Sequence, residues 1–177
     1  MPEPSATHLT PQDALHAWVG ACLADEVRLP DIDLPRQAAA EAGVLPWLGW
    51  RLHESGALAA LPGERQEDLR ASLRRWGLMH LDCEAELDRL ARSAAERGLR
   101  FLAFKGHSVA RTLYPNPACR PTSDFDLLID PAQVGLAQVW LAELGYTPLQ
   151  KFVGTLWLGA QSWSSDAASN ARFHADL

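Results

Sequence analysis

Two carboxylates stand two residues apart in an otherwise apolar stretch of the chain. Asp124 and Asp126 lie within the run Ser-Asp-Phe-Asp-Leu-Leu-Ile-Asp at residues 123–130. Alternate residues of a β-strand point to the same face, so this spacing predicts that the two acids share one face and that the apolar residues fill the other. Neighbouring carboxylates repel unless a cation lies between them. The pair therefore favours a divalent-metal site, although a bare Asp-x-Asp also occurs at strand ends that face water.

A lysine and a glycine form a second group, upstream of the acids. Lys105 and Gly106 follow the apolar run Phe-Leu-Ala-Phe at 101–104 and precede a predicted helix at 107–113. A helix N-terminus offers free N–H groups and a positive dipole end, and glycine allows a ligand to approach the backbone closely. These features suit a triphosphate, with Lys105 as an added charge. The alternative is a plain strand-to-helix turn with an exposed lysine.

Three polar residues flank the acidic strand. Arg120 and Ser123 precede it, and the guanidinium of Arg120 could bind a phosphate in a bidentate manner or pair with one of the acids. Phosphate is the preferred interpretation. Asp130 follows the strand, and the sequence Asp-Pro-Ala-Gln predicts that it caps a helix. We therefore leave Asp130 out of the predicted metal site, although its spacing puts it on the same face as the acids.

Taken together, these motifs resemble the nucleotidyltransferase superfamily, that is, the minimal core of the DNA polymerase β-like enzymes. More narrowly, they look like an uncharacterised bacterial nucleotidyltransferase-like family found beside lasso-peptide and other natural-product clusters. The resemblance covers roughly residues 70–177. The residues that carry it are Lys105-Gly106, Leu113-Tyr114-Pro115, Arg120 and the run Asp-Phe-Asp-Leu-Leu-Ile at 124–129.

The resemblance implies an α+β fold, with a mixed sheet flanked by helices and preceded by an N-terminal helical region. It implies a third acid on a later strand, a position that Asp176 fits. Asp124, Asp126 and Asp176 would then be the catalytic residues and would hold one or two Mg²⁺ ions. The nucleotide-binding residues would be Lys105, Gly106, Ser108, Arg120 and Ser123.

The activity implied is Mg²⁺-dependent transfer of a nucleotidyl group from a nucleoside triphosphate to a hydroxyl-bearing acceptor. One alternative is a catalytically silent module of the same fold that binds nucleotides or another protein. Another is a phosphotransferase that moves the γ-phosphate, because one fold hosts several chemistries. The acceptor is open between a small molecule, a peptide and a protein.

Composition limits the class of partner. The chain has 177 residues, 47% hydrophobic content and a formal net charge of −6, with a mean hydropathy of −0.13. An acidic chain argues against a nucleic-acid surface, which would be basic. No stretch approaches the ~20 apolar residues that span a bilayer. The three cysteines, Cys22, Cys83 and Cys119, have neither zinc-finger nor disulfide spacing, which favours a cytoplasmic location. Cys22 and Cys83 are expected in the core.

The pattern of turns and apolar residues predicts three regions: a disordered tail at 1–9, a helical region at 10–62, and a nucleotidyltransferase-like core at 63–177 that is shortened at its C-terminus. In the core we expect a long helix ending near Gly98 and an apolar strand at 99–104 covered on both faces. The tail predicts strands at 161–164 and 171–177. His80 is expected on the packed seam of the long helix. His107 is expected either to replace a phosphate-binding residue or to be exposed.

Overall fold

The computed structural model describes residues 9–148, 162–165 and 173–176. All but Leu9 of the predicted disordered tail, and the predicted loop at 165–170 beyond Ser165, lie outside these ranges. The chain divides into two compact units, one through Arg74 and one from Arg75 onward. Each unit is described by itself.

The first unit is helical. Its helix α1 begins at the predicted capping box, because the Thr10 side chain accepts from the Asp13 N–H and the Asp13 carboxylate accepts from the Thr10 N–H. Leu69, from the long helix α4, lies in the core of this unit, which explains why the unit includes the first turns of α4. The elements are α1 (Pro11–Leu23), α2 (Arg36–Glu41), α3 (Leu45–Glu54), the 3₁₀ helix η1 (Ala57–Ala60) and the start of α4 (Gly63–Glu96).

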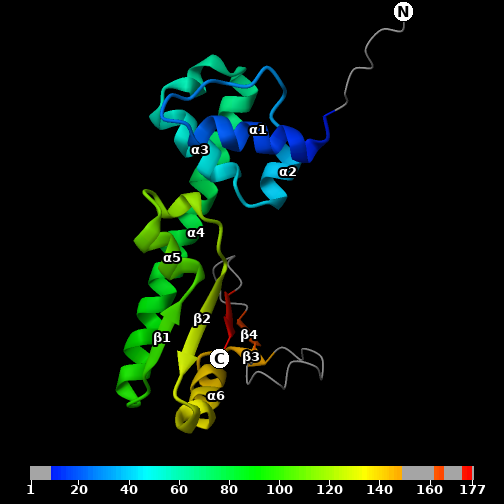
Figure 1. Ribbon diagram of the computed structural model, residues 1–177. Helices are drawn as coiled ribbons and strands as arrows, with labels where there is room; N and C mark the ends of the chain where they lie inside the picture. Colours follow the sequence, from blue (N-terminus) through cyan, green and yellow to red (C-terminus); the bar gives the residue numbers. More distant parts are fainter. Residues whose placement is uncertain (1–8, 149–161, 166–172, 177) are drawn as a thin grey trace, which may run out of the picture. The chain divides into compact units, whose positions relative to one another are not determined.

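The second unit combines the rest of α4 with a five-stranded sheet (Figure 1). The strand order is β1-β2-β5-β4-β3, with β2 and β5 parallel and the other pairs antiparallel. The predicted α+β fold with a mixed sheet is thereby confirmed. The elements are β1 (Phe101–Phe104), α5 (Gly106–Leu113), η2 (Pro117–Cys119), β2 (Asp124–Ile129), η3 (Pro131–Gln133), α6 (Val134–Glu143), β3 (Thr147–Pro148), β4 (Ser162–Ser165) and β5 (Phe173–Asp176).

Helices cover one face of strand β2. Phe125 and Leu127 point into a core that also holds Leu90 of α4 and Trp140 of α6. Burial of apolar side chains at every second residue therefore fixes which face of β2 lies against the helices.

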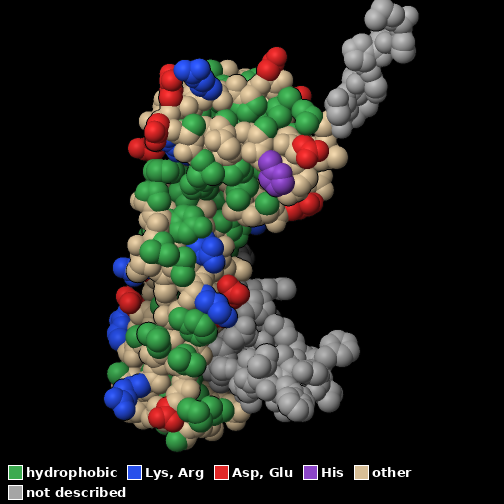
Figure 2. Space-filling view, in the orientation of Figure 1, with side chains coloured by type: hydrophobic (Ala, Val, Ile, Leu, Met, Phe, Trp, Pro, Cys, Tyr) green, Lys and Arg blue, Asp and Glu red, His purple; other side chains and the backbone are tan. Residues whose placement is uncertain are grey.

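The opposite face of β1 and β2 is open to solvent. Leu102 of β1 is 61% exposed, and its register partner Leu128 is 60% exposed. Figure 2 shows hydrophobic side chains exposed over these strands. The prediction that the first strand is covered on both faces is therefore wrong. A continuous apolar run does not reveal that an edge strand leaves one of its faces bare.

A buried ionic cluster joins α4 to the residue that precedes β3. The Glu86 carboxylate accepts a hydrogen bond from Arg89 Nε at 2.8 Å and one from the Tyr146 hydroxyl at 2.7 Å. Burial raises the pKa of Glu86, but the hydrogen bonds from Arg89 and Tyr146 outweigh it and hold the pKa below its ordinary value. Glu86 is therefore ionised at neutral pH, with both carboxylate oxygens hydrogen-bonded.

The three cysteines are buried and free. The expectation that Cys22 and Cys83 belong to the core is confirmed. Burial raises the pKa of Cys83 to about 12, and those of Cys22 and Cys119 to about 11. Such thiols stay protonated at neutral pH and are poor nucleophiles. Among the residues described here, no helix has the length and apolar content needed to cross a bilayer.

Candidate functional site

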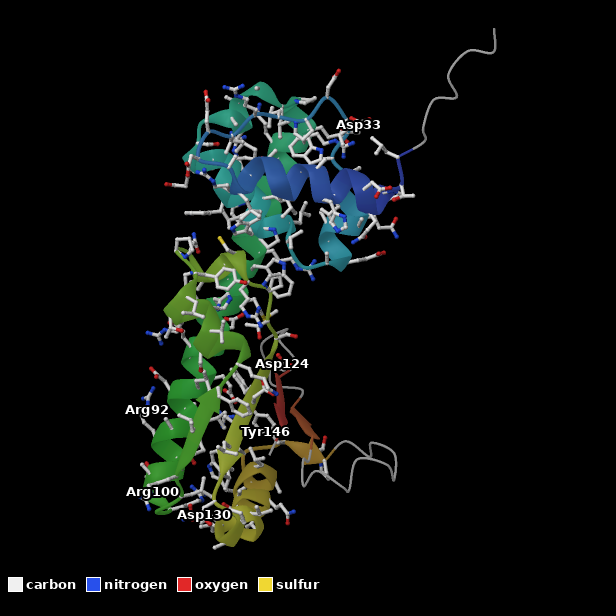
Figure 3. The ribbon with its side chains drawn as sticks, viewed as in Figure 1. Asp33, Arg92, Arg100, Asp124, Asp130 and Tyr146 are labelled. Carbon is white, nitrogen blue, oxygen red and sulfur yellow. The ribbon has the colours of Figure 1, made fainter. Side chains whose placement is uncertain are left out.

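The two acids of β2 share the face that the helices leave open. Asp124 is exposed and Asp126 is partly buried, while Phe125 and Leu127 are buried on the other side. Asp130 stands at the opposite end of the strand from Asp124 (Figure 3). Its carboxylate accepts a hydrogen bond from the Ala132 N–H at 2.8 Å, so its predicted capping role is confirmed. The acid pair is thus available for a cation, whereas Asp130 has a structural partner.

Gly106 places the strand-to-helix turn directly against the first acid. A Cβ at this position would lie 2.7 Å from Thr122 Oγ1 and 3.7 Å from Asp124 Oδ1, so no larger residue fits here without displacing its neighbours. Thr122 is buried, and its hydroxyl donates to Asp124 Oδ1 at 3.2 Å. Sequence reasoning missed Thr122 because its role arises only when the turn folds onto the start of β2. Its position two residues before Asp124 was the available signal.

Lys105 contacts the second acid. Its Nζ lies 3.2 Å from Asp126 Oδ1 and 4.8 Å from the centre of the Phe104 ring. Lys105 has φ +55° and ψ −144°, and it is the one residue other than glycine with a positive φ in the described part of the chain. Such a conformation costs about 1–3 kcal/mol and persists only where the surroundings impose it. The turn is therefore a strained element held beside both acids.

A helix starts directly at this turn. α5 begins at Gly106, and no side chain caps it at Lys105, so the first N–H groups have no acceptor inside the helix. Ser108 is differently placed, because its hydroxyl donates to the Ala103 carbonyl at 3.0 Å. It would have to give up that bond to donate to a phosphate.

Arg120 and Ser123 lie before β2, as the sequence places them. The Arg120 guanidinium carbon lies 5.9 Å from the centre of the Tyr114 ring, and its Nε is buried without a hydrogen-bond partner in the described part of the chain. Within those same residues, no ion pair joins Arg120 to Asp124 or Asp126. Ser123 is exposed. The guanidinium is thus not used to neutralise the acid pair.

Two buried histidines, one in the first turn of α5 and one in α4, contact each other next to the turn. His80 and His107 are each 4% exposed, with their rings stacked at 5.1 Å and their Nδ1 atoms 3.1 Å apart. His80 Nε2 lies 2.9 Å from the Arg120 carbonyl oxygen. Burial, and then the neighbouring His80, lower the pKa of His107, which keeps this ring neutral at neutral pH. His107 is therefore not the exposed residue that one of the two expectations described.

Asp176, the proposed third acid, belongs to β5. Its backbone pairs in register with that of Asp126 across the parallel β2–β5 ladder, and only its backbone position is described. The predicted tail strands are confirmed to within two residues as β4 and β5. Among the described side chains, no group of three or more His, Cys, Asp or Glu residues is placed to hold a metal, so a metal site there rests on Asp124 and Asp126.

The mixed sheet, with an acid pair beside a glycine turn at a helix start, agrees with the resemblance to nucleotidyltransferases. The chain belongs to a family described as uncharacterised nucleotidyltransferase, whose match covers residues 30–174. The match begins within the first unit, so the shared region is longer than the 70–177 suggested by the motifs. No curated protein matches the chain. No solved structure matches it.

Proposed function

We propose that the protein catalyses Mg²⁺-dependent nucleotidyl transfer from a nucleoside triphosphate to a hydroxyl-bearing acceptor. One observation carries the proposal: Asp124 and Asp126 share the open face of β2 beside the strained turn that starts α5. Asp126 pairs with Lys105 of that turn, and Asp124 lies where a side chain on Gly106 would approach it. Membership of the nucleotidyltransferase family supports it. A carboxylate pair next to a helix N-terminus suits a reactant that brings both phosphates and a divalent cation.

The donor set fits Mg²⁺. Asp124 and Asp126 offer only oxygen ligands, which this ion prefers, and substrate phosphates commonly complete its coordination. Lys105 balances the charge of Asp126 across 3.2 Å, which supports the proposal that this carboxylate binds a cation. We place Asp176 with the pair because its backbone is the register neighbour of Asp126. The bound ion would stabilise charge on the attacking and leaving oxygens of an in-line displacement.

The turn and its neighbours would bind the triphosphate. The start of α5 has no side-chain cap, so its first N–H groups have no acceptor inside the helix. Lys105 has its amino group at the acid pair, from where it can move to a phosphate once a metal ion takes over the charge of Asp126. The Arg120 guanidinium carries no carboxylate partner in the described residues and suits the leaving diphosphate. We assign Ser108 and Ser123 smaller roles, since Ser108 already donates to Ala103.

In the reaction, the acceptor hydroxyl attacks the α-phosphorus opposite the bridging oxygen between the α- and β-phosphates. The new oxygen–phosphorus bond forms, the hydroxyl loses its proton, and diphosphate leaves. The residues of the chain position the reactants and offset charge, and these two effects dominate this kind of chemistry. The open face of β1 and β2 leaves the acids accessible to an acceptor.

The decisive test replaces Asp126 by Asn and measures diphosphate release from each of the four nucleoside triphosphates with Mg²⁺ and candidate acceptors. We expect the Asp126→Asn variant to lose at least about a hundredfold in rate, because removing a charge-stabilising group costs that much. Asp130→Asn is the matched control, since Asn also accepts a hydrogen bond at a cap and should leave the rate unchanged. Equal rates in wild type and Asp126→Asn would contradict the assignment.

The same assay separates the alternatives. A γ-phosphotransferase would release nucleoside diphosphate instead of diphosphate. A silent nucleotide-binding module would bind Mg²⁺-nucleotide in calorimetry without any product, and a protein-interaction module would bind no nucleotide at all.

A further inference from the structure

Two buried histidines have no part in the proposed chemistry, yet they connect its two phosphate-binding segments. We propose that His80 and His107 are positioning residues, which hold the Lys105–Gly106 turn and the Arg120 segment at a fixed separation. The inference rests on the proposed function, because it concerns how the triphosphate site is built. All of these residues belong to the unit that begins at Arg75.

The Arg120 carbonyl oxygen sets the directions of the hydrogen bonds made by the two histidines. A carbonyl oxygen only accepts, so His80 Nε2–H donates to the Arg120 carbonyl at 2.9 Å. When that ring carries its one proton on Nε2, its Nδ1 is an acceptor, and His107 Nδ1–H donates to it at 3.1 Å. His107 Nε2 is left without a proton, and it is buried with no partner among the described residues. One chain of hydrogen bonds thus runs from the first turn of α5, through α4, to Arg120.

The turn needs such a support. Lys105 is held at φ +55°, and a strained residue returns to a relaxed conformation unless its neighbours are fixed. On its N-terminal side, strand β1 fixes it. On its C-terminal side, Gly106 has no side chain, so His107 is the first residue that can anchor α5 through its ring. Ser108 adds a bond to the Ala103 carbonyl, but that bond returns to β1 and does not reach Arg120.

Arg120 depends on the same pair. Its guanidinium carbon lies 5.9 Å from the centre of the Tyr114 ring, and in the described part of the chain its Nε is buried without a hydrogen-bond partner. Because no hydrogen bond orients its Nε, the direction of this side chain depends on its backbone, which His80 holds at the carbonyl. A shift of about 1 Å in a binding group can cost on the order of a hundredfold in rate. The histidine pair therefore controls the alignment of two cationic groups without touching the substrate.

The test compares variants that remove the hydrogen bonds with one that retains them. His80→Phe and His107→Leu fill the space but break the chain of bonds. His80→Gln keeps one donor and one acceptor. Leu90→Ala, on the same helix and buried in the core, is the control for lost stability alone. Each variant is measured for its melting temperature, for its KM and kcat with Mg²⁺-nucleoside triphosphate, for its Kd for the same complex, and for amide hydrogen exchange at residues 105–109 and 118–121.

We expect His80→Phe and His107→Leu to raise Kd and KM by about tenfold or more, and to exchange amide hydrogens faster in both segments. His80→Gln should restore much of the affinity. Leu90→Ala should lower the melting temperature without changing Kd. Wild-type affinity and protection in a folded His80→Phe variant would overturn the inference while leaving the proposed function intact. If the wild type binds no Mg²⁺-nucleotide, the proposed function fails and the positioning role fails with it. Hydrogen exchange then reports only whether the two segments are coupled.

Discussion

Gly106 is a site residue at which an added side chain would have no space. The nearest atom to an added Cβ would be Thr122 Oγ1 at 2.7 Å, closer than Cβ atoms approach other atoms in proteins. We therefore predict that Gly106→Ala lowers the free energy of unfolding by about 1–3 kcal/mol, as overpacking does. It should also weaken Mg²⁺-nucleotide binding, because Asp124 Oδ1 and the helix start move apart. Urea denaturation and calorimetric titration measure the two effects.

A second glycine in the same unit provides the control. Gly135, inside α6, has no atom within 4 Å of an added Cβ. Gly135→Ala should raise stability by about 0.5–1 kcal/mol, because alanine favours a helix. A double variant, Gly106→Ala with Thr122→Ala, removes the clashing hydroxyl and should recover part of the lost stability. A Gly106→Ala protein as stable as wild type would contradict the tight packing of this turn.

At the scale of elements, the sequence predicts what is local and misses what is tertiary. Thr10 and Asp13 cap α1 as expected, and α4 ends before Gly98, which has φ +66°, because these signals act within one turn of helix. The acid pair was predictable for the same reason, since the strand period alone puts Asp124 and Asp126 together. The contact of His80 with His107 spans 27 positions, and nothing in either segment signals it.

The hydrogen bond from Tyr146 to Glu86 of α4 gives a prediction about stability. Tyr146→Phe removes a hydrogen bond to the Glu86 carboxylate and should cost about 1.5–3 kcal/mol of stability at pH 7, the usual range for bonds to charged groups. The folded-state pKa of Glu86 is lowered. The stability that the ionised Glu86 carboxylate contributes is therefore fully present above the ordinary glutamate pKa of about 4.3. It is lost as the pH falls below that value.

Urea denaturation of wild type and Tyr146→Phe at pH 7 and at pH 3 measures this effect. The difference between the two proteins should shrink at the lower pH, because proton uptake by Glu86 weakens the bond that the hydroxyl donates to it. A difference that stays constant, or grows, as the pH falls would show that the hydroxyl stabilises the fold by some means other than the carboxylate.

For the whole molecule, the family match covers both units, whereas the proposed site lies in the second unit alone. The family region, residues 30–174, includes much of the helical first unit. Every residue we place in the nucleotide site belongs to the second unit, from Lys105 to Asp176. The net charge of −6 agrees with a protein that binds phosphates through a few aligned groups instead of a broad basic surface. The acceptor stays open between a small molecule, a peptide and a protein.

The most direct measurement is a crystal structure with Mn²⁺ in place of Mg²⁺ and a nucleoside triphosphate whose α–β bridge cannot be cleaved. Our account predicts an anomalous peak within about 2.2 Å of carboxylate oxygens from both Asp124 and Asp126, with the triphosphate against Lys105 and Gly106. A metal peak elsewhere, or a nucleotide bound away from this turn while both carboxylates stay unliganded, would contradict it.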